Sequence, residues 1–326
     1  MISVLMPTYN PDPQHLREAL NCLFKQTVRD WELIICQEPT GEDLKEIIPE
    51  FLADPRVTVH TNEKCLGIGP NWNRCLSYAQ YDLVQYLFQD DIWYPEMLEH
   101  LKRDLDDNPT AGMAVSFRIY KYEGEIANID MYEKIMKFQL NILKPGFNNG
   151  KELLLWWLQR GLHPNIIGEP PFLMMRKAAM EEAGPFHATM TQGLDNEYWS
   201  KMLAVADMVW TPTTLGEFRV HNAGASAINQ RAGRGLADRL NILYNLSQFK
   251  DKDIAKAADG ALKEHLPRMM AKYLDRKKTG GNVSAGSSKE IKEFCMSHPL
   301  LSSTSLLKAT TNRKYYRELN DAFENE

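Results

Sequence analysis

Two adjacent carboxylates, Asp90 and Asp91, carry the clearest chemical signal in the chain. They follow the apolar run of residues 83–88, whose β-branched and aromatic side chains predict a buried strand. Ligands of open α/β sheets bind at the carboxyl ends of the strands. Paired carboxylates there repel each other unless a cation is present, and a divalent metal carrying a diphosphate would supply one. Asp is also a common helix N-cap, and residues 95–105 have a helical pattern, so the pair alone leaves a capping role open.

The surrounding chain alternates between strand and helix patterns at short, regular spacing. Residues 2–6, 31–36 and 56–60 predict strands, and residues 14–25 carry apolar side chains at helical spacing. A further helix, ending near residue 79, precedes the strand that leads to the acid pair. This order predicts an α/β fold with a mostly parallel sheet flanked by helices.

Short motifs lie between these elements in a fixed order. They are Pro7-Thr8-Tyr9-Asn10, Gln37-Glu38, Gly67 with Asn73, Gln89-Asp90-Asp91, Gly168-Glu169-Pro170, Gly184-Pro185-Phe186, residues 193–199 around Asp195, and residues 218–221 ending in His221. Together they resemble the motifs of family-2 glycosyltransferases with the GT-A fold, over roughly the first 230 residues. The resemblance implies an inverting enzyme that uses a nucleoside diphosphate sugar, with a UDP-sugar as the expected donor, and Mn²⁺ or Mg²⁺ as cofactor.

The same resemblance implies a role for individual residues. Asp91 is the expected metal carboxylate, and Asp90 is expected to face the ribose or a metal-bound water. His221 is expected to bind the metal or the diphosphate. The residues expected on the nucleotide-sugar side are Thr8, Tyr9, Glu38, Gly67, Asn73 and Asp90. Gln37-Glu38 departs from the usual Asp-Asp-Gly-Ser, which weakens the assignment of Glu38 to the base or ribose.

Asp195 matches the family's catalytic base. The acceptor hydroxyl must lose its proton as it attacks, and a carboxylate of ordinary pKa, near 4, is ionised at neutral pH. Asp195 also precedes the helical pattern of residues 196–204, so it would suit an N-cap, but the flanking motifs favour catalysis. One base without a second nucleophilic carboxylate predicts a single displacement with inversion.

Other nucleotide-binding classes lack their motifs here. A sugar-phosphate nucleotidyltransferase needs a glycine-rich phosphate loop after the first strand, and residues 7–11 contain no glycine. A dehydrogenase needs G-x-G-x-x-G after a strand, and Gly67-Ile68-Gly69 is too short a fragment. The alternative that remains is a catalytically degenerate transferase-like domain that only binds nucleotide sugar, since Gln37 replaces the usual Asp.

Composition limits the partners and the location. The net charge of −5 over 326 residues and a pI near 6.0 disfavour a nucleic-acid binder. Five cysteines without a CxxC pair indicate reduced, buried thiols. No apolar stretch approaches the roughly 18 residues that span a bilayer, and no signal precedes the first strand. We expect a cytoplasmic protein, at most peripheral to the inner face of the membrane, that glycosylates a saccharide or other hydroxyl acceptor in surface polysaccharide or glycoconjugate synthesis.

Three parts are expected along the chain. Residues 1–115 would form the nucleotide-sugar-binding α/β half, and residues 116–230 the acceptor-binding half with the base. Residues 231–326 would form a C-terminal helical appendage, in which the helix of residues 254–274 is expected to be interrupted by Pro267. This appendage should supply no catalytic group and should pack on the catalytic part or on a second copy in a homo-oligomer.

Overall fold

The computed structural model describes all residues except 42, 127–128, 233, 236, 279–284 and 317–326. Contacts within the chain divide it into two compact units. Unit 1 comprises Met1–Leu153, Pro164–Thr189 and Leu194–Gly224, and unit 2 comprises Leu154–His163, Met190–Gly193 and Ala225–Glu326. The three-part division expected from the sequence stays a prediction.

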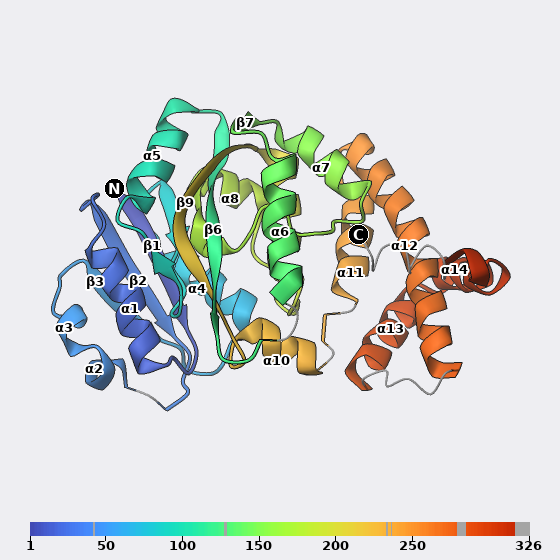
Figure 1. The fold of residues 1–326 in the computed structure, drawn as a ribbon, viewed down its shortest axis with the longest axis horizontal. Coiled ribbons are helices and arrows are strands. Elements are labelled where there is room, and N and C mark those ends of the chain that lie inside the picture. Colours follow the sequence, from blue (N-terminus) through green and yellow to red (C-terminus); the bar gives the residue numbers. More distant parts are fainter. Residues whose placement is uncertain (42, 127–128, 233, 236, 279–284, 317–326) are drawn as a thin grey trace. The chain divides into compact units, whose positions relative to one another are not determined.

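Unit 1 is built on one nine-stranded sheet, shown in Figure 1. Its strands are β1 (Ile2–Thr8), β2 (Trp31–Gln37), β3 (Val57–Thr61), β4 (Leu83–Tyr86), β5 (Ile92–Trp93), β6 (Ala111–Glu123), β7 (Gly146–Asn148), β8 (Leu173–Arg176) and β9 (Asp207–His221). They run in the order β3-β2-β1-β4-β8-β6-β9-β5, with β7 paired to β9. The first four are mutually parallel, β6 and β9 are parallel, and β5, β7 and β8 run antiparallel to their neighbours. The α/β fold class expected from the sequence is confirmed.

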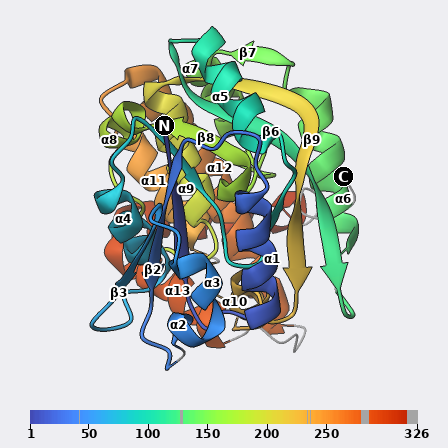
Figure 2. The same ribbon diagram turned by 90° about the vertical axis from the view of Figure 1, so that its left-hand side faces the viewer.

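Helices cover both faces of this sheet. In unit 1 they are α1 (Pro13–Phe24), α2 (Leu44–Ile47), α3 (Pro49–Leu52), α4 (Ile68–Tyr78), α5 (Met97–Asp107), α6 (Ile129–Ile142), the first part of α7 (Gly150–Leu158), the 3₁₀ turn η1 (Pro170–Phe172), α8 (Lys177–Ala183) and α9 (Leu194–Val205). Figure 2 shows α1 and α4 on opposite sides of β1 and β2. Alternate residues of a strand point to opposite faces, and on β1 Ile2, Val4 and Met6 join the core cluster that contains the apolar side of α1.

Unit 2 is helical. It contains α10 (Ala225–Ala232), α11 (Asp238–Ser247), α12 (Lys252–Lys278), α13 (Ala285–Ser297) and α14 (Pro299–Thr311). The expected interruption at Pro267 is wrong, because α12 continues through that residue. Proline removes one backbone hydrogen bond from a helix, but burial of Ile254, Ala258 and Leu266 on the same helix offsets that loss. Within the described part of the chain, no helix is both long and apolar enough to cross a membrane.

Candidate functional site

Asp90 and His221 meet at the edge of the sheet in unit 1. Asp90 follows β4 in the chain, and His221 is the last residue of β9. The Nε2 atom of His221 lies 3.0 Å from Oδ2 of Asp90, and both side chains are partly exposed, at 18% and 25%. The bond to Asp90 is the main cause that raises the pKa of His221. Two residues 131 positions apart therefore form one accessible pair.

Asp91 lies behind that pair and is fully buried. Its Oδ1 accepts a hydrogen bond from the backbone N–H of Arg219 at 3.0 Å, while its Oδ2 has no partner. Burial first, and the charge of Asp90 second, raise the pKa of Asp91 well above its usual range. A buried carboxylate oxygen without a partner is costly, so Asp91 favours a nearby cation.

Arg219 holds the turn that carries both acids. Its Nε donates to the backbone oxygen of Asp90 at 2.8 Å, and its guanidinium also pairs with Glu18 and Glu123. The Arg219 side chain is buried, so these contacts fix its position against the acid pair. The motif that ends in His221 thus also determines where Asp90 and Asp91 lie.

Beside this edge, Thr8 offers its hydroxyl and Tyr9 its ring for contact with a ligand. Thr8 is buried and its Oγ1 has no hydrogen-bond partner. The Tyr9 side chain is 62% exposed, while its backbone N–H and oxygen are both bonded to the amide of Gln89 at 2.9 and 3.0 Å. An exposed ring on a fixed backbone is suited to stacking against a nucleobase.

Glu38 and Asn73 are engaged inside unit 1. The Glu38 carboxylate accepts hydrogen bonds from the backbone of Leu66 and Gly67 and from Asn62, at 2.9–3.0 Å. The Asn73 amide exchanges two 2.8 Å bonds with the backbone of Phe186. These bonds shape the segment around Gly67, whose φ of +90° favours glycine. Direct contact of these residues with a nucleotide stays a prediction.

Asp195 is half-buried at the start of α9. Its Oδ2 accepts from Nδ2 of Asn165 at 2.9 Å, and its Oδ1 accepts from the backbone N–H of Asn196 at 2.8 Å. Burial raises the pKa of Asp195 to about 7, and the charge of Glu169 contributes. The ordinary pKa assumed from the sequence is therefore wrong. A carboxylate with a pKa near neutral is well matched to general-base catalysis.

The charge of Glu169 raises the pKa of both Asp91 and Asp195, so this carboxylate interacts with both parts of the site. Tyr120 donates to its Oε1 at 2.9 Å, and the fully buried Arg118 donates to its Oε2. Arg118 also contacts Gln139 and the Tyr120 hydroxyl. Sequence reasoning included Glu169 in a motif but gave it no role, and it missed Arg118.

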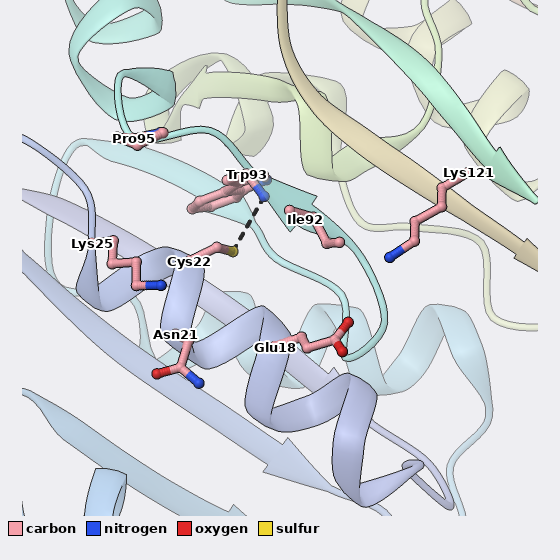
Figure 3. A pocket seen from close by; sticks show the side chains of 8 residues that line it. All are labelled: Glu18, Asn21, Cys22, Lys25, Ile92, Trp93, Pro95 and Lys121. Atoms are coloured by element: carbon pink, nitrogen blue, oxygen red, sulfur yellow. Dashed lines mark hydrogen bonds between the residues drawn. The ribbon is translucent and has the colours of Figure 1, made fainter.

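A separate hollow of about 430 Å³ opens beside α1 (Figure 3). Its lining includes Glu18, Lys25, Trp93 and Lys121, and none of the residues predicted for the site. The backbone N–H of Trp93 bonds to the Cys22 sulfur at 3.2 Å in its wall. Glu18, one of the lining residues, connects the hollow to the site through its ion pair with Arg219.

A divalent metal fits the donor set at the acid pair. Asp90, Asp91 and His221 offer carboxylate oxygens and an imidazole nitrogen, and Oδ2 of Asp91 is buried without a partner. The described residues include no group of three or more His, Cys, Asp or Glu side chains arranged to hold a metal alone. Mg²⁺ commonly binds one or two carboxylates together with substrate phosphates. The arrangement suits a metal that is completed by a diphosphate.

Comparison with known proteins gives the family. Residues 3–153 match the model of Glycosyl transferase family 2. The UDP-Glc:alpha-D-GlcNAc-diphosphoundecaprenol beta-1,3-glucosyltransferase WfgD of Escherichia coli is 31% identical over 99 residues, which are 30% of this chain and 38% of WfgD. This chain therefore matches less than half of the length of that relative.

Two solved structures share the fold. S. aureus TarS 1-349 in complex with UDP-GlcNAc superposes with a TM-score of 0.67 at 15% identity, over 99% of this chain and 91% of that one. Mannosyltransferase PcManGT from Pyrobaculum calidifontis, in complex with GDP-Man and Mn²⁺, gives 0.58 at 16% identity, over 96% and 87%. With the family match, residues 3–153 form a family-2 glycosyltransferase domain, and the chain has the GT-A fold.

Proposed function

We propose that this glycosyltransferase is metal-dependent and inverting, and that it moves a sugar from a nucleoside diphosphate sugar to an acceptor hydroxyl. The observation that carries the proposal is the Asp90–His221 pair beside a buried Asp91 oxygen that has no partner. A diphosphate-bound cation would satisfy all three groups at once. Asp195, with a pKa of about 7, supplies the base that the reaction needs.

The donor is proposed to be a UDP-sugar. TarS was solved with UDP-GlcNAc, PcManGT with GDP-Man, and WfgD is named for UDP-Glc. The exposed Tyr9 ring and the unpartnered Thr8 hydroxyl would contact the base and ribose. Glu38, Gly67 and Asn73 would shape the neighbouring wall through the hydrogen bonds that hold their segment.

Asp90, Asp91 and His221 would hold Mn²⁺ or Mg²⁺ against the donor diphosphate. When bound, the ion neutralises the negative charge that gathers on the leaving group. Arg219 keeps the two acids in place through its backbone N–H and its Nε. Asp91 is the carboxylate that the sequence favours as metal ligand, and Asp90 is the more exposed of the two.

Asp195 would take the proton of the acceptor hydroxyl during attack. The acceptor oxygen forms a bond to the anomeric carbon, and the bond from that carbon to the diphosphate breaks with its electron pair. Both oxygens of Glu169 already accept hydrogen bonds from Tyr120 and Arg118. Because Glu169 is occupied, it is poorly suited to act as a second nucleophile, and this favours one displacement with inversion.

The cellular role follows the expectation from the sequence. We propose a saccharide or other hydroxyl acceptor, in surface polysaccharide or glycoconjugate synthesis, and a cytoplasmic location with at most peripheral membrane contact. Self-association through the C-terminal helices is part of this proposal. Apolar side chains exposed on α14, with Leu300 at 85% and Leu307 at 65%, are compatible with such contacts.

Calorimetric titration of UDP, UDP-GlcNAc, UDP-glucose and GDP-mannose, with Mn²⁺ or with chelator, tests donor binding. We expect at least one to bind with an affinity that falls about tenfold or more, which is about 1.4 kcal/mol, when the metal is removed. Asp90→Asn and Asp91→Asn should each abolish that difference. If the metal-dependent difference disappears in Asp90→Asn but remains in Asp91→Asn, then Asp91 is not a metal ligand and serves only to accept the hydrogen bond from the Arg219 backbone. Metal-dependent binding without any turnover would favour the catalytically degenerate alternative.

A further inference from the structure

One carboxylate oxygen of unit 2 gathers three consecutive backbone N–H groups. Oδ2 of Asp238, in the first turn of α11, accepts from Thr191, Gln192 and Gly193 at 3.2, 2.9 and 2.9 Å. Asp238 is buried. Successive N–H groups that point to one place form a nest for an anion, and here the side chain of Asp238 fills it. The segment Met190–Gly193 is thereby tied to a residue 45 positions later.

Close packing leaves this segment little freedom. A Cβ on Gly193 would lie 2.9 Å from Cβ of Asp238, and one on Gly235 would lie 2.2 Å from Cβ of Gln192. Gly235 also has a φ of +81°, which favours glycine. Added methyl groups at these positions would therefore push the segment away from α11.

The turn before α11 is itself held by α13. Oε1 of Glu290 accepts from the backbone N–H of Gly235 at 2.9 Å, and its Oε2 accepts from that of Ala237 at 3.2 Å. The helical unit thus contains a continuous series of hydrogen bonds, from α13 through Ala237 and Asp238 to the segment Met190–Gly193. None of these residues belongs to the site at the sheet edge.

The segment held by Asp238 leads directly into the helix of the base. Gly193 is followed by Leu194, the first residue of α9, and by Asp195. We propose that Asp238 is a positioning residue that fixes the start of α9 through the backbone of Thr191–Gly193 and so orients the carboxylate of Asp195. The inference rests on the proposed function, because it concerns the base of that reaction.

The physical reason lies in how little movement catalysis tolerates. A displacement of about 1 Å at a reacting group can cost on the order of 10²-fold in rate. Without the Asp238 carboxylate, three N–H groups would lose their common acceptor and the backbone would move to find others. Asp195 would then be less enclosed and would move away from Glu169, the charged group that faces it among the described residues.

Asp238→Ala tests the inference in the full-length protein. The readouts are metal-dependent release of UDP from UDP-GlcNAc, or from whichever nucleotide sugar binds, UDP affinity by calorimetry, and the pH dependence of kcat. We expect kcat to fall by about tenfold or more, UDP affinity to stay within about twofold, and the rising limb of the pH profile to move below its wild-type midpoint near pH 7. Asp238→Asn keeps an oxygen for the same N–H groups and should recover much of kcat.

Two further variants separate positioning from general stability. Gly193→Ala disturbs the segment while Asp238 is intact, so it should also lower kcat, and it serves if Asp238→Ala does not fold. Asp207→Ala is the matched control, because Oδ1 of Asp207 accepts from Asn149 and from the backbone of Gly150 at the start of α7. It should lower the melting temperature without changing kcat or the pH midpoint.

The inference is overturned if Asp238→Ala, or Gly193→Ala when the former does not fold, keeps wild-type kcat and pH midpoint. It is also overturned if Asp207→Ala changes kcat and the pH midpoint as strongly as Asp238→Ala does. Asp195→Asn separates the claim that Asp195 is the base from the claim that Asp238 positions it. If Asp195→Asn keeps wild-type turnover, the proposed base fails. If Asp195→Asn loses turnover while the Asp238 and Gly193 variants do not, only the positioning role fails.

Discussion

Asp195→Asn should stabilise the protein at neutral pH while it removes the base. Burial raises the pKa of Asp195 from an ordinary 3.8 to about 7. Between these values the folded protein keeps a proton that the unfolded chain releases, so the wild type loses stability as pH rises through this range. Asparagine does not ionise, so the variant avoids this loss.

The size of the effect follows from the shift. A difference of about 3 pKa units corresponds to roughly 4 kcal/mol, and roughly 2.5 kcal/mol of this develops between pH 5 and pH 8. The variant has one carbonyl oxygen for the two donors on Asn165 and Asn196, so it also loses about 1 kcal/mol at every pH. The difference in unfolding free energy, variant minus wild type, should therefore rise by roughly 2.5 kcal/mol from pH 5 to pH 8.

Urea unfolding of both proteins across that pH range measures the difference. Asp12→Asn is a useful control, because Asp12 is an exposed N-cap of α1. The backbone hydrogen bond from His15 is the main cause that lowers the pKa of Asp12, so this carboxylate is ionised in both states above about pH 5. The difference in unfolding free energy between Asp12→Asn and wild type should therefore stay constant from pH 5 to pH 8. A constant difference for Asp195→Asn as well would refute the desolvated base.

Three further substitutions probe the surroundings of the site. Tyr9→Ala should weaken UDP binding by about tenfold in calorimetry, since base stacking is worth roughly 1–3 kcal/mol. Tyr9→Phe should bind UDP like wild type. Equal UDP affinity in wild type and both variants would show that Tyr9 does not contact the base. Arg118→Met should lower the unfolding free energy by about 3–5 kcal/mol, because it leaves Glu169 without its buried partner, and adding Glu169→Gln should restore part of it; an additive double variant would contradict the pairing. Gly168→Ala should lower the melting temperature, because φ is +110° and the new Cβ would lie 3.2 Å from the Arg118 guanidinium carbon; an unchanged melting temperature would show that the backbone there relaxes.

The sequence was informative wherever local pattern determines structure. The strands β1 to β4 follow from short apolar runs, and their parallel order follows from the helices between them. That order also predicts that the ends of β1 and β4 lie at one edge, which is where Thr8 and Asp90 are found. The helix through Pro267 was missed, because tertiary burial along α12 outweighs a local rule.

The parts that the sequence did not reveal depend on contacts between distant residues. Asn165 bonds Asp195 across 30 positions, and the backbone N–H of Arg219 bonds Asp91 across 128. No local sequence pattern indicates either of these two hydrogen bonds. The raised pKa of Asp195 has the same origin, since it depends on how neighbouring elements enclose the carboxyl. The sequence likewise offered no reason to single out Asp238, whose three N–H donors lie 45 to 47 positions earlier.

The most direct test of the account is the turnover of Asp195→Asn with a nucleotide sugar that binds and with Mn²⁺. Release of the nucleoside diphosphate is followed as a function of pH, in parallel with wild type. We predict that wild-type kcat rises through about pH 7, as Asp195 loses its proton. In the variant kcat should fall by roughly 10²-fold or more, with donor and metal affinity retained. Wild-type turnover in a variant that still binds donor would contradict the central claim that Asp195 is the base of glycosyl transfer.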